Sequence, residues 1–124
     1  MKRIVIADDS STARMFIRRC LEIIGLRDET FVEAANGREA LAHLKEAPTD
    51  LLVTDLNMPQ MDGEALLKWI RANPKLSSLP VVVITSAGNP AKEARLLELG
   101  ALRVINKPVT PTILVDTLGF LLKK

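Results

Sequence analysis

Several acidic side chains follow short apolar segments, at positions where they can take part in chemistry. Asp8 and Asp9 come directly after the apolar segment Ile4–Ala7, and Asp55 ends the segment Leu51–Asp55. A single aspartate at such a position often caps a turn or the following helix, so each acid alone is a weak indication. Three carboxylates that meet at one place repel one another, and this conflict favours a hard divalent cation such as Mg²⁺.

A threonine and a lysine also follow apolar segments. Thr85 comes directly after Val81–Ile84, and Lys107 comes shortly after Leu102–Ile105. Each alone is typical of a strand end or a solvated loop, but beside an acidic cluster both can bind phosphoryl oxygens. Acids, metal, hydroxyl and ammonium together predict a site that transfers a phosphoryl group onto a carboxylate, with Asp55 as the acceptor.

Five apolar segments alternate with five helical patterns along the chain, without a repeat, a low-complexity segment or a linker. The predicted strands are Ile4–Ala7, Thr30–Ala34, Leu51–Asp55, Val81–Ile84 and Leu102–Ile105. The predicted helices begin at Ser10 or Ser11, near Arg38, at Glu64, at Asn89-Pro90 and at Thr110-Pro111. This alternation predicts an α/β fold, a doubly wound (βα)5 sandwich with a five-stranded parallel sheet and helices on both faces.

The natural strand order for such a sheet is 2-1-3-4-5. In this order the carboxyl ends of the first and third strands flank the crevice in which ligands of these sheets bind. Asp8, Asp9 and Asp55 are therefore expected to meet there, with Thr85 and Lys107 on the neighbouring strands.

The composition indicates one ordinary globular domain. The chain has 124 residues, of which 48% are hydrophobic and 26% charged. A net charge of +2 gives no indication of a nucleic-acid partner. The single cysteine, Cys20, excludes an intrachain disulfide and a cysteine-based metal site. Because no apolar run approaches the length of a membrane span, we expect a cytoplasmic protein without a membrane partner.

Four motifs at four successive strand ends resemble those of response-regulator receiver domains of the CheY type. They are Ala7-Asp8-Asp9-Ser10, the segment from Asp55 to Gly63 (DLNMPQMDG), Ile84-Thr85-Ser86-Ala87 and Asn106-Lys107-Pro108. The resemblance covers the whole chain. It implies a flavodoxin/CheY-like fold in which residues 1–124 form one receiver domain without an output domain.

The resemblance also implies the cofactor and the acceptor. Asp55 would be the phosphoacceptor. Mg²⁺, for which Mn²⁺ can substitute, would bind Asp9 and Asp55 directly, the backbone carbonyl of Asn57, and Asp8 mainly through water.

The same resemblance assigns the groups around the phosphoryl group. Thr85 and Lys107 would contact it, and the backbone at Asn57 and Ser86 would help to hold it. The side chains of Asn57 and Ala87 occupy positions that tune the phosphoryl lifetime in the family. The peptide bond between Lys107 and Pro108 is expected to be cis.

By resemblance, the protein is a response regulator of two-component signal transduction. The phosphoryl donor would be a phosphohistidine on a histidine kinase or a histidine phosphotransfer protein. The chain would catalyse only its own phosphorylation and slow dephosphorylation, so it would not be an enzyme in the usual sense. Its output would be a changed surface on the fourth helix, fifth strand and fifth helix, which a downstream protein partner binds.

One position departs from the family pattern. The family often has Tyr or Phe three residues before the lysine, whereas this chain has Val104 there and no tyrosine at all. An aromatic rotamer switch therefore cannot operate. We expect switching to depend instead on Thr85 and on rearrangement of the Ser86–Pro90 loop and the helix after it.

Three other functions fit part of the sequence. A haloacid-dehalogenase-like phosphatase also forms an aspartyl phosphate, but it needs a general acid two residues after Asp55, where this chain has Asn57. An FMN carrier would use the hydroxyls of Ser10–Thr12, but Asp8 and Asp9 would repel the FMN phosphate. A receiver-like docking module that is never phosphorylated would not need the complete set of acids, threonine and lysine.

Overall fold

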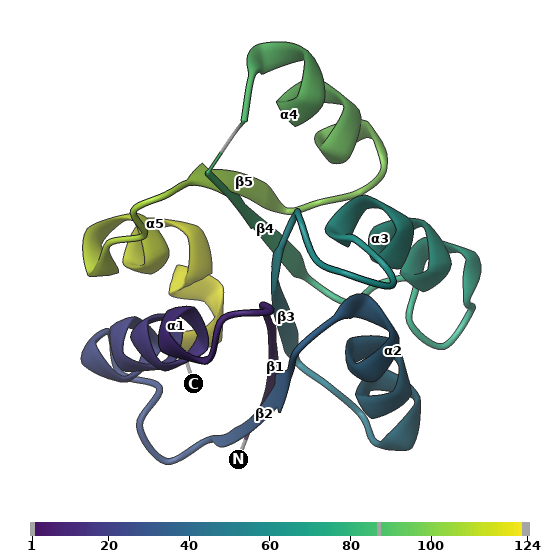
Figure 1. Ribbon diagram of the computed structural model, residues 1–124. Helices are drawn as coiled ribbons and strands as arrows, with labels where there is room; N and C mark the ends of the chain where they lie inside the picture. The colour runs from purple at the N-terminus through teal and green to yellow at the C-terminus, as the bar shows by residue number, and fades with distance from the viewer. Residues whose placement is uncertain (1, 87, 123–124) are drawn as a thin grey trace.

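Figure 1 shows the computed structural model, which describes residues 2–86 and 88–122. Within these residues, five strands form one parallel sheet in the order β2-β1-β3-β4-β5. The strands are β1 (Arg3–Ala7), β2 (Thr30–Ala34), β3 (Leu51–Asp55), β4 (Val81–Thr85) and β5 (Arg103–Asn106). The predicted fold class and strand order are confirmed. Ala87, to which the sequence assigns a part in the phosphoryl lifetime, lies outside the described residues.

The helices cover both faces of the sheet, as predicted. They are α1 (Ser11–Ile23), α2 (Gly37–Glu46), α3 (Gly63–Ala72), α4 (Pro90–Glu98) and α5 (Pro111–Leu122). In Figure 1, α1 and α5 lie on one face, and α2 and α3 lie on the other with α4 beside them. Among the described residues, no helix combines the length and the apolar character that crossing a membrane requires.

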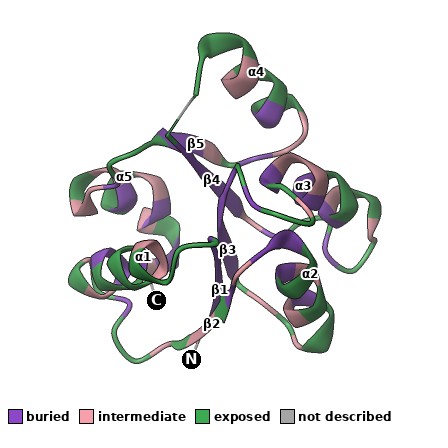
Figure 2. Ribbon diagram, viewed as in Figure 1, coloured by how far each residue is buried: buried purple, intermediate pink, exposed green. Residues whose placement is uncertain are grey.

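Alternate residues of the strands fill two separate cores. On β1, Ile4 and Ile6 belong to the core under α1 and α5, while Val5 and Ala7 belong to the core under α2, α3 and α4. Every residue of β3 and β4 is buried, because parallel strands in this architecture are covered on both faces (Figure 2). The strand ends that carry the polar motifs are therefore held by a rigid, fully packed sheet.

Polar side chains fix the point where most of the helices begin. The caps are Ser10, Asn36, Asp62 and Asn89, each of which accepts a hydrogen bond from a backbone N–H three residues later. The cap of α1 is Ser10, which decides between the two serines that the sequence left open. Because Ser10 directly follows Asp8 and Asp9, the two acids that come after β1, the start of α1 is tied to the position of those acids.

Helix α4 is joined to α3 by a group of ion pairs around one carboxylate. Glu64, in the first turn of α3, accepts hydrogen bonds from Lys92 Nζ at 2.7 Å and from Arg95 Nε at 3.1 Å. Lys68 Nζ lies 3.4 Å from the same carboxylate. These hydrogen bonds, that from Lys92 first, lower the pKa of Glu64 to about 2. Leu96 is the residue of α4 that is fully buried, so α4 depends on this polar attachment.

We expect Glu64→Gln to lower the free energy of unfolding by about 1 kcal/mol at pH 7, as for a partly exposed ion-pair network. A carboxyl with a depressed folded-state pKa stabilises the protein above its ordinary pKa of 4.5 and loses this effect as the pH falls toward 2. The difference between wild type and variant should therefore shrink as the pH falls from 7 to 3 in urea titrations. Glu98→Gln, on exposed surface without an ion pair among the described residues, is the control. A difference that does not change with pH would contradict this account.

Candidate functional site

Three carboxylates meet at the carboxyl ends of β1 and β3. These strands are neighbours with Ala7 beside Thr54, so the residues that follow are brought together. Asp8, Asp9 and Asp55 each offer one oxygen, and these oxygens all lie within 4.8 Å of one another. Asp8 is 1% exposed and Asp55 is 7% exposed, whereas Asp9 lies on the surface. The predicted convergence of the acids is thus present in the structure.

Backbone groups hold one oxygen of each buried acid. Asp8 Oδ1 accepts a hydrogen bond from the Ser10 N–H at 2.9 Å, and Asp55 Oδ1 accepts one from the Leu56 N–H at 2.9 Å. The Asp8 N–H itself donates to the Ala34 carbonyl of β2 at 3.0 Å. The second oxygens, Oδ2 of both acids, accept no hydrogen bond within the described residues and remain able to bind a ligand.

Lys107 brings a positive charge to these second oxygens. Its Nζ lies 3.5 Å from Asp8 Oδ2 and 3.7 Å from Asp55 Oδ2. The backbone N–H of Lys107 donates to the Thr85 carbonyl at 2.9 Å, which ties the loop after β5 to the end of β4. The peptide bond between Lys107 and Pro108 is cis, as the resemblance implied.

The surroundings of Asp55 raise the pKa of its carboxyl above the ordinary value. Burial is the largest cause of a raised pKa at Asp55, and the charge of Asp8 raises it further, with a smaller effect of Asp9. The ammonium of Lys107 and the Leu56 N–H act in the opposite direction, without fully compensating. One lysine therefore does not neutralise three acids in this pocket.

The donor set fits a hard divalent cation. Asp8 Oδ2 is a buried oxygen without a hydrogen bond, which is costly unless a further positive partner binds it. The cluster offers carboxylate oxygens and no sulfur or imidazole ligand, a chemistry that suits Mg²⁺, Mn²⁺ or Ca²⁺ better than zinc or copper. The acidic pocket is consistent with a divalent metal site.

The other predicted site residues lie at the same edge of the sheet. Thr85 is fully buried at the end of β4, paired in register with Asn106 of β5. Asn57 and Ser86 are exposed in the loops that follow β3 and β4. Their roles toward a phosphoryl group stay predictions.

The loop after Asp55 returns tightly against the strand that it leaves. The Gly63 N–H donates to the Leu56 carbonyl at 2.8 Å, and a Cβ atom at Gly63 would lie 2.6 Å from the Asp55 carbonyl oxygen. Only glycine fits this close approach. The start of α3 is therefore packed directly against the backbone of Asp55.

Sequence reasoning missed one basic residue beside the site. Arg14 belongs to α1 and lies outside the four sequence motifs, but its Nη1 donates to the Asp8 carbonyl at 2.6 Å. Its Nε also donates to Glu33 Oε1 on β2 at 2.8 Å. The available signal was its position one helical turn after the cap Ser10, which places it over the loop that carries the acids.

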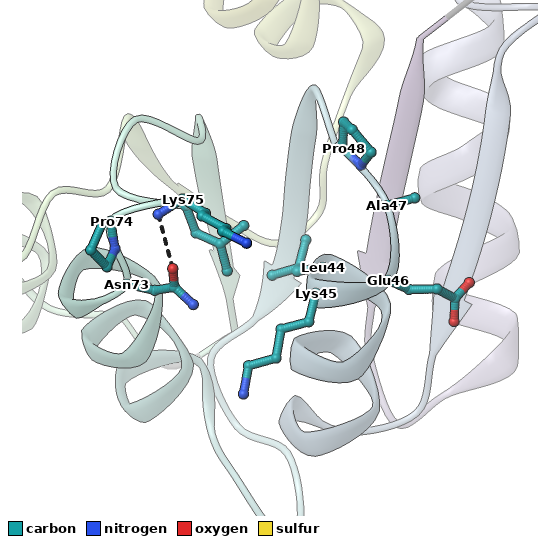
Figure 3. Close-up of a pocket in the computed structure, with 9 residues that line it drawn as sticks. Leu44, Lys45, Glu46, Ala47, Pro48, Asn73, Pro74 and Lys75 are labelled. Atoms are coloured by element: carbon teal, nitrogen blue, oxygen red, sulfur yellow. Dashed lines mark hydrogen bonds between the residues drawn. The ribbon is translucent and has the colours of Figure 1, made fainter.

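A second hollow lies elsewhere, between the C-terminal ends of α2 and α3, with a volume of about 630 Å³ (Figure 3). Leu44, Pro48, Pro74 and Leu76 are among the residues that line it. The Lys75 N–H is hydrogen-bonded to Asn73 Oδ1 at 2.9 Å. The residues that line this hollow include none of the predicted site residues, so the candidate site remains the acidic pocket.

Comparison with known proteins points to one family. The family model of the response regulator receiver domain matches residues 4–119. Chemotaxis protein CheY1 of Helicobacter pylori is 37% identical over 121 residues, which are 97% of this chain and 96% of that protein. Sensor histidine kinase CheAY of Helicobacter pylori is 39% identical over 103 residues, 82% of this chain and 12% of that protein.

A solved structure agrees with these sequence matches. Chemotaxis response regulator CheY4 of Vibrio cholerae superposes with a TM-score of 0.83 at 31% identity, covering 97% of this chain and 98% of that one. The likeness in fold therefore covers nearly the whole chain.

Removing one charge from the acidic pocket should stabilise the metal-free protein. We expect Asp8→Asn, in EDTA at neutral pH, to raise the free energy of unfolding by about 1 kcal/mol, because repulsion with Asp55 is relieved while an acceptor for the Ser10 N–H is kept. Saturating Mg²⁺ should stabilise the wild type and have a much smaller effect on the variant.

The control for this prediction is Asp28→Asn, which removes the same charge from an exposed residue without an ion pair among the described residues. Thermal unfolding with and without Mg²⁺ measures both effects. A metal-free Asp8→Asn protein that is less stable than the wild type would show that the lost ion pair with Lys107 outweighs the relief of repulsion, which would contradict this account.

Proposed function

Because this chain belongs to the response regulator receiver family, we propose that it accepts a phosphoryl group on Asp55 and passes on a two-component signal through its surface. The observation that carries the proposal is the convergence of Asp8, Asp9 and Asp55 in one pocket, with Lys107 Nζ within 3.7 Å of two of them. The family membership predicted by resemblance is confirmed, and the phosphatase and FMN-carrier alternatives are not favoured.

The transfer is a displacement at phosphorus. An Asp55 carboxylate oxygen attacks the phosphorus of a phosphohistidine, an O–P bond forms, and the P–N bond breaks with its electron pair returning to the imidazole nitrogen, which then takes a proton. Asp55 Oδ2 is the oxygen suited to attack, since Oδ1 accepts the Leu56 N–H. Hydrolysis by water later returns the free carboxylate and inorganic phosphate.

Asp8, Asp9, Asp55 and the backbone carbonyl of Asn57 would hold Mg²⁺, for which Mn²⁺ can substitute. When bound, the cation neutralises charge on the acids and on the phosphoryl oxygens. The buried, unbonded Asp8 Oδ2 supports this assignment, as does the purely oxygen character of the cluster.

The remaining polar groups would bind the incoming phosphoryl group. Lys107 already faces Asp55 Oδ2, where the ammonium can pair with a phosphoryl oxygen after transfer. Thr85 would donate its hydroxyl, and the backbone N–H groups near Asn57 and Ser86 would complete the contacts. The chain catalyses only reactions of its own Asp55, so we do not class it as an enzyme with an external substrate.

A histidine kinase or a histidine phosphotransfer protein is the proposed donor, and a cytoplasmic location is part of this proposal. The match to a segment of the sensor histidine kinase CheAY supports a kinase partner. The proposed output surface comprises α4, β5 and α5. On it Leu97 is 45% exposed and Phe120 is 49% exposed, so the surface offers apolar contacts to a protein target.

The acceptor assignment is tested by intact mass spectrometry after incubation with acetyl phosphate and Mg²⁺. We expect the wild type to gain about 80 Da, one phosphoryl group. Asp55→Asn should show no gain, because the amide is not a competent nucleophile, and EDTA should abolish the gain in the wild type. A gain of the same mass by Asp55→Asn would place the acceptor elsewhere.

Switching is tested by NMR with beryllofluoride, a mimic of the phosphoryl group. A phosphoryl group adds about −1.5 to −2 charges and several acceptor oxygens, and α4 is attached mainly through Leu96 and the Glu64 ion pairs. We expect backbone amide shifts to extend from the pocket through the loop after Thr85 into α4. Shifts that stay within the acidic pocket would show that the signal does not reach the output surface.

A further inference from the structure

Arg14 links the loop that carries Asp8 and Asp9 to strand β2. Its side chain is 16% exposed, so it is held against the protein rather than extended into solvent. Nη1 donates to the Asp8 carbonyl at 2.6 Å, while Nε donates to Glu33 Oε1 at 2.8 Å. One planar guanidinium thus donates to the acidic loop through Nη1 and to the edge strand β2 through Nε.

The Asp8 backbone is fixed from both sides by this arrangement. Its N–H donates to the Ala34 carbonyl of β2, and its carbonyl accepts from Arg14, which is anchored by the neighbouring residue Glu33. The Asp8 carboxylate accepts the Ser10 N–H in addition. The direction of the Asp8 side chain is therefore set by the contacts of its main chain together with the Ser10 N–H.

The positive charge of Arg14 has the same sign as the cation that the acidic pocket would bind. A guanidinium that binds the backbone of the acidic loop lowers the negative potential that attracts a divalent ion, so by Coulomb's law alone its removal should strengthen binding of the ion. The ion pair with Glu33 reduces this penalty without abolishing it. A basic residue at this position must therefore contribute through geometry if it helps the site at all.

We propose that Arg14, anchored by Glu33, is a positioning residue for Mg²⁺ binding, because it fixes the Asp8–Asp9 loop so that both carboxylates face Asp55. This inference rests on the proposed function, since it concerns the same acidic pocket. It adds two residues that lie outside the four sequence motifs. Residues that do not touch a metal ion but orient its ligands typically contribute about tenfold or more to the affinity for the metal.

The chain offers a matched control on the same helix face. Arg18 lies one turn after Arg14, and its guanidinium stacks over the Phe31 ring at 4.7 Å and pairs with Glu22 at 3.6 Å. No contact of Arg18 with the acidic loop is present among the described residues. Arg18→Gln removes the same charge from nearly the same side of the site without removing a contact to Asp8.

Isothermal titration calorimetry of the full chain with MgCl2 tests the proposal. We expect Arg14→Gln to bind Mg²⁺ about tenfold more weakly than the wild type, and Arg18→Gln to bind it equally or slightly more tightly. Arg14→Lys keeps the charge but not the two-sided fork, so it should also bind more weakly. Circular dichroism and thermal unfolding establish that each variant is folded.

A double-mutant cycle tests the anchor. Glu33→Gln should weaken Mg²⁺ binding in the wild type and have little further effect in Arg14→Gln, because the two residues act as one unit. Equal effects in both backgrounds would mean that Glu33 acts by charge alone, which would overturn its part in the proposal.

Two results would overturn the role of Arg14. One is an Arg14→Gln protein, folded, that binds Mg²⁺ as tightly as the wild type or more tightly. The other is an equal loss in Arg14→Gln and Arg18→Gln, since this would reflect a general effect of the helix. A wild type that binds no Mg²⁺ would instead contradict the proposed function itself.

Discussion

Mutual repulsion among carboxylates is the constraint on which this site depends. Asp8 and Asp55 are almost completely buried, Asp9 stands beside them, and Lys107 is the cation that reaches both buried acids. This arrangement costs stability in the absence of a further positive partner, as the raised pKa of Asp55 indicates. Because a divalent ion relieves the repulsion among the acids, the same cost in stability favours binding of such an ion in the pocket.

A rigid sheet is what allows so unfavourable a cluster to persist. The strands β1 and β3 lie side by side in the middle of the sheet, and every residue of β3 is buried. Asp55 is itself the last residue of its strand, and Gly63 packs the start of α3 against its carbonyl. The acids therefore cannot move apart without disturbing the cores on both faces of the sheet.

Ion pairs outside the pocket connect its movable parts to this rigid frame. Arg14 joins the loop after β1 to Glu33 on the edge strand, and Glu64 joins α3 to Lys92 and Arg95 on α4. Glu64 directly follows the glycine that packs on Asp55, while Lys92 lies in the helix that follows Thr85 and its loop. The acceptor side of the pocket and the side that should respond to phosphorylation are thus linked through charged side chains.

The sequence by itself determined the five strands, the strand order, the family and the meeting of Asp8, Asp9 and Asp55. The fold follows from the alternation of apolar segments and helices, and the meeting of the acids follows because a parallel sheet brings its carboxyl strand ends to one edge. The family followed from the resemblance of four motifs at the strand ends. Strand ends and helix starts were predicted to within one or two residues, as at β5, which was expected over Leu102–Ile105 and runs from Arg103 to Asn106.

Only the tertiary structure decided which side chains from distant elements meet. Helical periodicity places Arg14 and Arg18 on one face, but the position of β2 gives the first an anchor at Glu33 and leaves the second over Phe31. Helical periodicity likewise does not decide whether Trp69 is buried, and in the structure this residue is 56% exposed. Periodicity reports the direction of a side chain relative to its own helix, whereas a partner is defined by the packing of whole elements against one another.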